Sequence, residues 1–161
     1  PYWRMTYDDG VMESLAVVAA SLARRLLAGA AACGLAANGW TYTPSRIGFV
    51  APRPGRDQLA RIADILGRLT PVASVPFDDL LAVLPGRLAG GSLIWIVSSR
   101  DLAEVARLLR RLRASGFEVR SAAVGPRAAA HAAVARRLGV EATAARLRPD
   151  WRTADAVKLA G

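Results

Sequence analysis

The stretch from Ser92 to Gly125 constrains the fold more than any other part of the chain. It reads SLIWIVSS, then DLAEVARLLRRLRASG, then FEVRSAAVG, so that an apolar run, an amphipathic segment and a second, largely apolar run follow one another. An uncharged run such as the first is typical of a central strand covered on both faces. Two strands joined through a helix form a βαβ unit, whose strands are parallel and whose crossover is right-handed. The sequence therefore predicts an α/β fold.

The same alternation of helix and strand extends along the rest of the chain. After Gly125, residues 126–139 are expected to form a helix between Pro126 and Gly139, followed by a strand over 140–147. Before Ser92, the spacing of apolar residues and of breakers predicts helices over 13–29, 54–70 and 75–88, and two short strands, 32–39 and 45–52, that form a hairpin. The predicted fold class is a three-layer, doubly wound, mostly parallel sheet, and at 161 residues and 17.0 kDa the chain is expected to be one domain.

Composition narrows the class of protein further. With 53% hydrophobic and 22% charged residues, the chain is expected to fold rather than stay disordered. The apolar run before Arg24 is about half of the ~20 residues that a bilayer requires, so no membrane span is predicted within this chain. Because the chain begins at Pro1 and shows no targeting signal, it is expected to be a piece of a longer protein.

The strongly basic balance does not by itself indicate nucleic-acid binding. The formal net charge is +9, and Lys158 is the only lysine among the 22 basic residues. The arginines are spread along the chain, with no basic tail and without the interleaved aromatic residues of stacking platforms. We therefore expect solvated helix faces and no nucleic-acid partner.

The residue types that carry most enzyme chemistry are scarce. Cys33 and His131 are each the only residue of their kind; Cys33 lies in an apolar strand that predicts packing, and His131, on an Ala-rich helix, is predicted to be a surface or packed histidine rather than a ligand or base. Gly-rich phosphate loops, G-x-S-x-G, H-E-x-x-H and paired-cysteine motifs do not occur. The sequence predicts no catalytic residue, no metal ligand and no cofactor.

Ligands of open α/β sheets lie beyond the carboxyl ends of strands, so the strand ends supply the remaining candidates. The residues predicted to face a ligand there are Asn38, Ser74, Ser98, Ser99 and Gly125. Asp101 is better explained as a helix N-cap, and Asp78 and Asp79 as first-turn carboxylates that favour the helix dipole. Trp40, in the loop of the predicted hairpin, either forms an exposed aromatic tip or covers the sheet edge.

Three segments together resemble a bacterial family. They are ESLAVVAASLARRLLAGAAACGLAANG, PRPGRDQLARIADILGRLTPV and SLIWIVSSRDLAEVARLLRRLRASGFEVRSAAVG, and they resemble the C-terminal half of domain of unknown function 58 proteins over residues 13–125. Those proteins look like von Willebrand factor A-type domains, which hold a divalent cation at the carboxyl edge of the sheet. The resemblance implies a single von Willebrand factor A-like domain fragment over residues 1–161.

The cation site of that family has a recognisable ligand pattern. It combines an Asp-x-Ser-x-Ser loop with a Thr and an Asp from later loops; by the resemblance, Ser74 lies near the Thr position and Ser99 near the Asp position. Asp-x-Ser-x-Ser does not occur in this chain, so a strong metal site is not expected. The family's first strand would precede Glu13, and either residues 2–7 replace it or it lies upstream.

The resemblance also supplies the expected function. It implies a noncatalytic protein–protein interaction domain on the cytoplasmic face of a membrane-anchored bacterial protein, with the anchor upstream and a MoxR-type AAA+ ATPase as partner. The alternative is a small-ligand or cation-binding enzyme domain that uses the strand ends near Ser98 and Ser99. A missing first strand would leave a sheet edge exposed and favour a homodimer.

Overall fold

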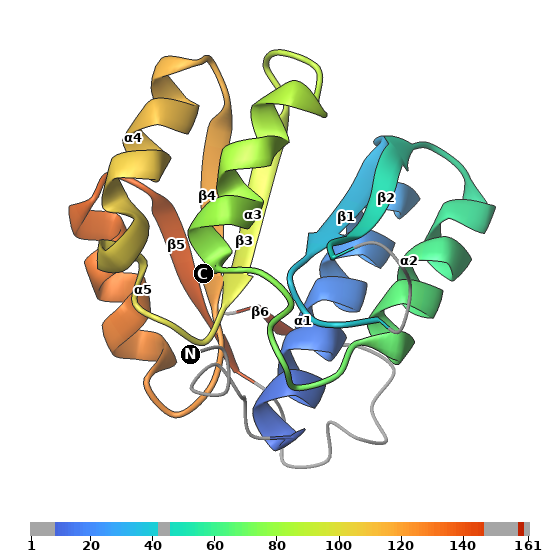
Figure 1. Cartoon of the computed structure of the whole chain (residues 1–161), viewed down its shortest axis with the longest axis horizontal. Helices are drawn as coiled ribbons and strands as arrows, with labels where there is room; N and C mark the ends of the chain where they lie inside the picture. Colours follow the sequence, from blue (N-terminus) through green and yellow to red (C-terminus); the bar gives the residue numbers. More distant parts are fainter. Residues whose placement is uncertain (1–8, 42–45, 147–157, 160–161) are drawn as a thin grey trace. The chain divides into compact units, whose positions relative to one another are not determined.

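A computed structural model describes residues 9–41, 46–146 and 158–159 (Figure 1). The elements are, in chain order, α1 (Asp9–Ala28), β1 (Cys33–Ala37), β2 (Gly48–Arg53), α2 (Arg56–Arg68), α3 (Phe77–Val83), the 3₁₀ turn η2 (Leu84–Gly86), β3 (Leu93–Ser98), the 3₁₀ turn η3 (Leu102–Val105), α4 (Ala106–Ala114), β4 (Glu118–Ala123), α5 (Ala128–Arg137), β5 (Glu141–Arg146) and β6 (Lys158–Leu159). The chain divides into two compact units, Pro1–Arg87 and Leu88–Gly161.

The first unit is built on an antiparallel hairpin. Strands β1 and β2 pair in a register that places Leu35 opposite Val50, which confirms the hairpin predicted from the sequence. Helices α1 and α2 pack against each other and against the hairpin. The core between them contains Cys33, Ile62 and Leu66, all buried.

One buried glutamine ties α2 to both strands of the hairpin. The register shifts between Cys33 and Leu35, and this bulge brings the backbones of β1 and β2 unusually close at Gly34, where a Cβ atom would lie 2.5 Å from the carbonyl oxygen of Val50. Beside the bulge, Gln58 Nε2 donates hydrogen bonds to the carbonyl oxygens of Cys33, at 2.7 Å, and Ala51, at 2.8 Å. Because one amide carries two N–H groups, Gln58 satisfies both carbonyls at once.

Helix α3 ends close to where the sequence predicts. Within residues 75–88 the sequence predicts a short helix that opens at Pro76 and closes at Pro85-Gly86; α3 ends at Val83, and the chain continues as the 3₁₀ turn that contains Pro85. Proline has no backbone N–H to continue the helical ladder, so the helix ends before it. Asp78 and Asp79 lie in the first turn of α3, as predicted.

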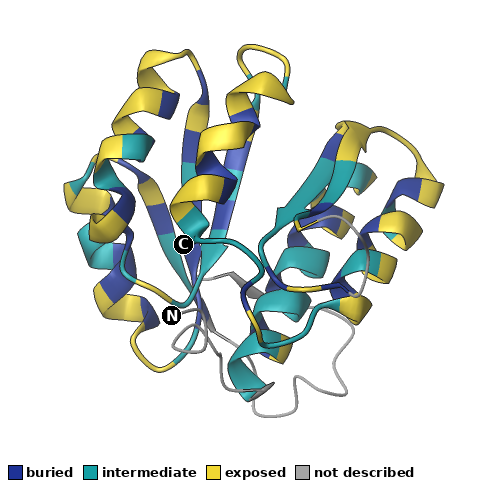
Figure 2. Cartoon of the chain, in the orientation of Figure 1, coloured by how far each residue is buried: buried dark blue, intermediate teal, exposed yellow. Residues whose placement is uncertain are grey.

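The second unit contains the predicted parallel sheet. Strands β3, β4 and β5 are parallel neighbours, and β6 pairs antiparallel with β5. The prediction that the strand within 92–99 is central is wrong for the described sheet, because β3 pairs with β4 alone and lies at its edge. Helices α4 and α5 form the two crossovers and contact the sheet through buried residues (Figure 2). The structure thus confirms a mixed α/β fold with a three-stranded parallel sheet flanked by helices.

Other expectations have different outcomes. No helix within the described ranges combines the length and apolarity that crossing a bilayer requires. That residues 1–161 form one domain stays a prediction. The substitute strand proposed for residues 2–7 lies outside the residues that the structure describes.

Replacing Gln58 with alanine tests the connection between α2 and the hairpin. We expect Gln58→Ala to lower the free energy of unfolding by about 2–3 kcal/mol, because two buried carbonyls lose their donor. Urea unfolding followed by circular dichroism measures the change. Arg61→Ala, on the exposed side of the same helix, is the control and is expected to stay within about 0.5 kcal/mol of the unmodified chain. Equal loss in the two variants would contradict this role for Gln58.

Candidate functional site

The structure separates the five predicted strand-end residues into two groups. Ser98, Ser99 and Gly125 meet at the carboxyl edge of the parallel sheet in the second unit. Asn38 and Ser74 meet in the first unit.

The first group forms where β3 and β4 end. The carbonyl oxygen of Ser98 accepts a hydrogen bond from the Val124 N–H at 2.9 Å, and its Oγ accepts one from the Arg100 N–H at 3.0 Å. Gly125 has a φ of 95°, a left-handed conformation that glycine adopts without strain. A Cβ atom at Gly125 would lie 3.9 Å from Ser99 Cβ, so the two loops touch at this point.

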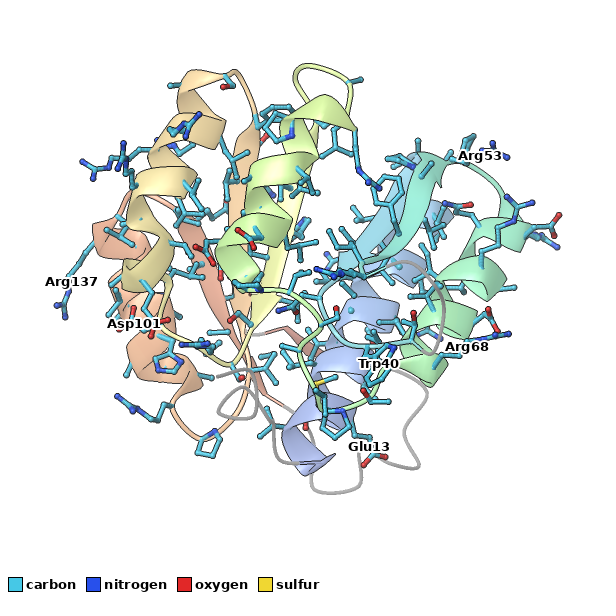
Figure 3. The ribbon with its side chains drawn as sticks, viewed as in Figure 1. Glu13, Trp40, Arg53, Arg68, Asp101 and Arg137 are labelled. Carbon is cyan, nitrogen blue, oxygen red and sulfur yellow. The ribbon has the colours of Figure 1, made fainter. Side chains whose placement is uncertain are left out.

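Asp101 and its neighbours close the turn that follows β3. Asp101 Oδ1 accepts a hydrogen bond from the Ala103 N–H at 2.8 Å, which confirms the predicted N-cap (Figure 3). The capped element differs from the prediction, because the chain makes the 3₁₀ turn η3 before α4 begins at Ala106. Arg100 forms an ion pair with Glu104 at 2.6 Å. These bonds define the turn and leave Asp101 in a structural role.

In the first unit, Asn38 and Ser74 hold the end of β1 against the segment that leads to α3. The carbonyl oxygen of Asn38 accepts from the Ser74 N–H at 2.7 Å, and Asn38 Nδ2 donates to the Val75 carbonyl at 3.2 Å. Ser74 Oγ lies within hydrogen-bonding distance of the carbonyl oxygens of Asn38, at 2.9 Å, and Arg46. These contacts are internal and fix the backbone.

Cys33 is a packed residue, as the sequence predicts, and His131 is buried, an outcome that the sequence left open between the surface and the core. His131 lies on α5 among the buried residues Ala128, Ala132 and Ala135, and its Nδ1 has no hydrogen-bond partner in the described structure. Cys33 is buried at the start of β1, and desolvation raises the pKa of its thiol. A raised pKa keeps the thiol protonated and therefore a poor nucleophile.

Metal-binding side chains do not converge in the part of the chain that the structure describes. No group of three or more His, Cys, Asp or Glu residues there has an arrangement suited to a metal ion. Comparison of the chain with family models, with curated proteins and with solved structures finds no match.

Two exposed apolar residues, Trp40 and Val72, lie on neighbouring segments of the first unit, and the sequence analysis had identified only Trp40. Gly39 pairs with Ala73 in an isolated antiparallel bridge, and beside it the Trp40 N–H donates to the Val72 carbonyl at 2.9 Å. Cross-strand neighbours project from the same face, so the two side chains lie next to each other. Trp40 is 49% exposed and Val72 37%. We call these two residues the Trp40–Val72 patch (Trp40 is labelled in Figure 3).

Sequence reasoning had singled out Trp40 but not Val72. Trp40 and Val72 lie about thirty positions apart in the sequence, and no local motif predicts that their segments pair. The apolar character of both residues was the only available signal.

Removing the Asp101 carboxylate is expected to weaken the turn without affecting any chemistry. Asp101→Ala leaves the Ala103 N–H without its acceptor and lowers the free energy of unfolding by about 1 kcal/mol. The matched control, Asp101→Asn, keeps an acceptor oxygen and most of the stability. Chemical denaturation measures both variants; if asparagine destabilised the chain as much as alanine, Asp101 would have a role other than capping.

The Cys33 thiol gives the stability a defined pH dependence. Because the pKa is raised in the folded state, the contribution of Cys33 is fully present below the thiol's ordinary pKa and is lost as the pH rises through the native pKa. Urea unfolding from neutral to alkaline pH measures the loss, and Cys33→Ala is the control that lacks the titrating group. An identical alkaline decline in the two proteins would show that other groups cause it.

Proposed function

We propose that this chain is a noncatalytic protein–protein interaction domain with a von Willebrand factor A-like, doubly wound fold. The parallel sheet flanked by helices agrees with the broad class, and the finer assignment rests on the resemblance to domain of unknown function 58 proteins. By that resemblance, the domain belongs to the cytoplasmic face of a membrane-anchored bacterial protein. Its partner is a MoxR-type AAA+ ATPase.

The Trp40–Val72 patch is the observation that carries the binding role. Tryptophan buries a large area with few rotatable bonds and is enriched among the residues that dominate interface energies. Trp40 is 49% exposed and Val72 37%. The exposed part of these two apolar side chains is the surface that would contact a partner protein.

The polar strand ends support binding rather than catalysis. The Ser98 hydroxyl accepts from a backbone N–H, Asp101 caps η3, and Ser74 bonds to backbone carbonyls. A nucleophile needs a base within hydrogen-bonding reach. Ser98 and Asp101 instead bond to backbone N–H groups two residues away, and Ser74 bonds to the distant backbone carbonyls of Asn38 and Arg46.

The charge of the chain indicates the chemistry of the partner surface. A net charge of +9 attracts an acidic surface and raises the association rate at low ionic strength. The proposed partner would therefore present acidic residues around an apolar pocket for Trp40.

Binding to a purified MoxR-type AAA+ ATPase tests this function. At near-physiological salt we expect the chain to retain the ATPase in a pull-down, and Trp40→Ala to weaken the binding at least tenfold, because it removes the apolar anchor. Val83→Ala is the control, since Val83 is 39% exposed on α3, away from the patch. Retention of no ATPase by the unmodified chain would refute the partner, and equal retention by both variants would refute the patch.

A second candidate is an enzyme or binding domain for a small ligand or a cation. The meeting of Ser98, Ser99 and Gly125 at the carboxyl edge of the sheet favours it, since such edges bind ligands in open α/β folds.

Thermal unfolding with nucleotides and divalent cations distinguishes the two functions. A ligand held at 100 times its Kd adds about 2.7 kcal/mol of stability and raises Tm measurably. We expect an unchanged Tm across the panel. A rise that Ser99→Ala abolishes would favour the second candidate.

A further inference from the structure

Strand β3 is an edge strand, and its unpaired edge is the feature that carries a further inference. In the described sheet the order is β3-β4-β5-β6, and β3 pairs with β4 alone, from Leu93 opposite Glu118 to Ser98 opposite Ala123. A strand at the edge of a sheet presents a row of backbone N–H and C=O groups to any strand that approaches.

Two hydrogen bonds establish which backbone groups face that edge. The carbonyl oxygens of Ser92 and Ser98 accept hydrogen bonds from β4 and its continuation, at 3.2 and 2.9 Å. Backbone groups alternate in direction along a strand, so Ile94 and Ile96 also face β4. The N–H and C=O groups of Leu93, Trp95 and Val97 therefore point away from β4, toward the unpaired edge.

We propose that this edge pairs antiparallel with the same edge of a second copy of the chain, about a two-fold axis at Trp95. Leu93 then lies opposite Val97 of the partner subunit, and Trp95 opposite Trp95 of the partner subunit. In this register every outward-facing residue meets another outward-facing residue. Each such pair exchanges two N–H···O bonds. The inference depends on the sheet alone and not on the Trp40–Val72 patch.

The symmetry of the edge favours a second copy as its occupant. A two-fold interface requires a surface that is complementary to itself. The outward-facing positions of β3 are symmetric about Trp95, with a residue of aliphatic character two positions to each side. The pairing would merge two four-stranded sheets into one continuous sheet of eight strands, a size that natural open sheets reach.

The amino-acid composition of β3 also favours pairing with another strand. Its sequence, LIWIVS, contains no charged residue and no proline, the two kinds of residue that commonly protect a free edge from pairing. Leu93 is 38% exposed, although it is apolar. Burial of such residues between two copies would contribute about 25 cal/mol per Å² of apolar area.

Charge repulsion near the axis is small despite the basic composition of the chain. By the strand registers, Trp95, Arg120 and Glu141 form one row across the sheet. Arg120 lies over the Trp95 ring, with its guanidinium carbon 6.0 Å from the ring centroid, and it forms ion pairs with Glu118 at 2.8 Å and Glu141 at 3.2 Å. The cation nearest the axis on this row is therefore already neutralised within its own subunit.

Sedimentation of the full chain over a micromolar-to-millimolar concentration series tests the dimer. We expect a monomer–dimer equilibrium, and we expect Leu93→Lys to raise the dimer Kd at least tenfold, because it places a charge at the pairing edge. Val83→Lys is the matched control, since Val83 on α3 is 39% exposed and Leu93 38%. Circular dichroism checks that both variants fold. A chain that stays monomeric throughout, or a dimer that both variants weaken equally, overturns the proposal.

Cross-linking tests the register independently of the lysine variants. In a Cys33→Ala background, which removes the native thiol, Leu93→Cys and Val97→Cys are prepared separately and treated with a short bis-maleimide. A mixture of the two variants is expected to form covalent dimers, because Leu93 and the partner's Val97 are directly opposite. Each variant alone is expected to cross-link poorly, since its two thiols lie about 14 Å apart along the strands at 3.4 Å per residue. Cross-linking of either variant alone as efficiently as the mixture overturns the proposed register.

Discussion

The parallel pairing of β3 with β4 is the constraint on which most of the second unit depends. Parallel neighbours cannot be joined by a tight turn, so the chain between Ser98 and Glu118 must travel back along the sheet, which it does through η3 and α4. The same pairing places the ends of both strands at one edge of the sheet. Ser98, Ser99 and Gly125 meet there for that reason.

The polar residues at that edge are of types that occur both in helix caps and turns and in ligand-binding loops. Serines, an aspartate and a glycine after a strand are the residue types of ligand-binding loops, and they are equally the types that end strands and begin helices. At this edge the Ser98 Oγ and Asp101 Oδ1 both accept from backbone N–H groups within two residues. The surfaces on which the two proposals rest lie elsewhere: the Trp40–Val72 patch, whose two side chains are partly exposed, and the edge of β3 that faces away from β4.

The accuracy of the sequence-based predictions follows from how local each signal is. The βαβ unit was predictable because an uncharged strand, an amphipathic helix and a glycine are contiguous in the sequence. The end of α3 was predicted near Pro85-Gly86 because proline and glycine interrupt a helix locally. The 3₁₀ start of the next crossover was missed, since an N-cap such as Asp101 precedes 3₁₀ and α-helical turns alike. The role of Gln58 could not be predicted, because its two acceptors, the carbonyls of Cys33 and Ala51, lie on different strands. No short sequence motif indicates the bulge that positions them.

The sequence by itself determined the α/β class, the hairpin, the order of the main helices and strands, and the packed role of Cys33. It could do so because periodicity, breakers and caps act over a few residues. Only the tertiary structure decided that Trp40 lies beside Val72, that the five strand-end residues fall into two groups, and that β3 is an edge strand in the described sheet. Those outcomes depend on which distant segments form backbone hydrogen bonds with one another, and burial of the whole core selects that pairing.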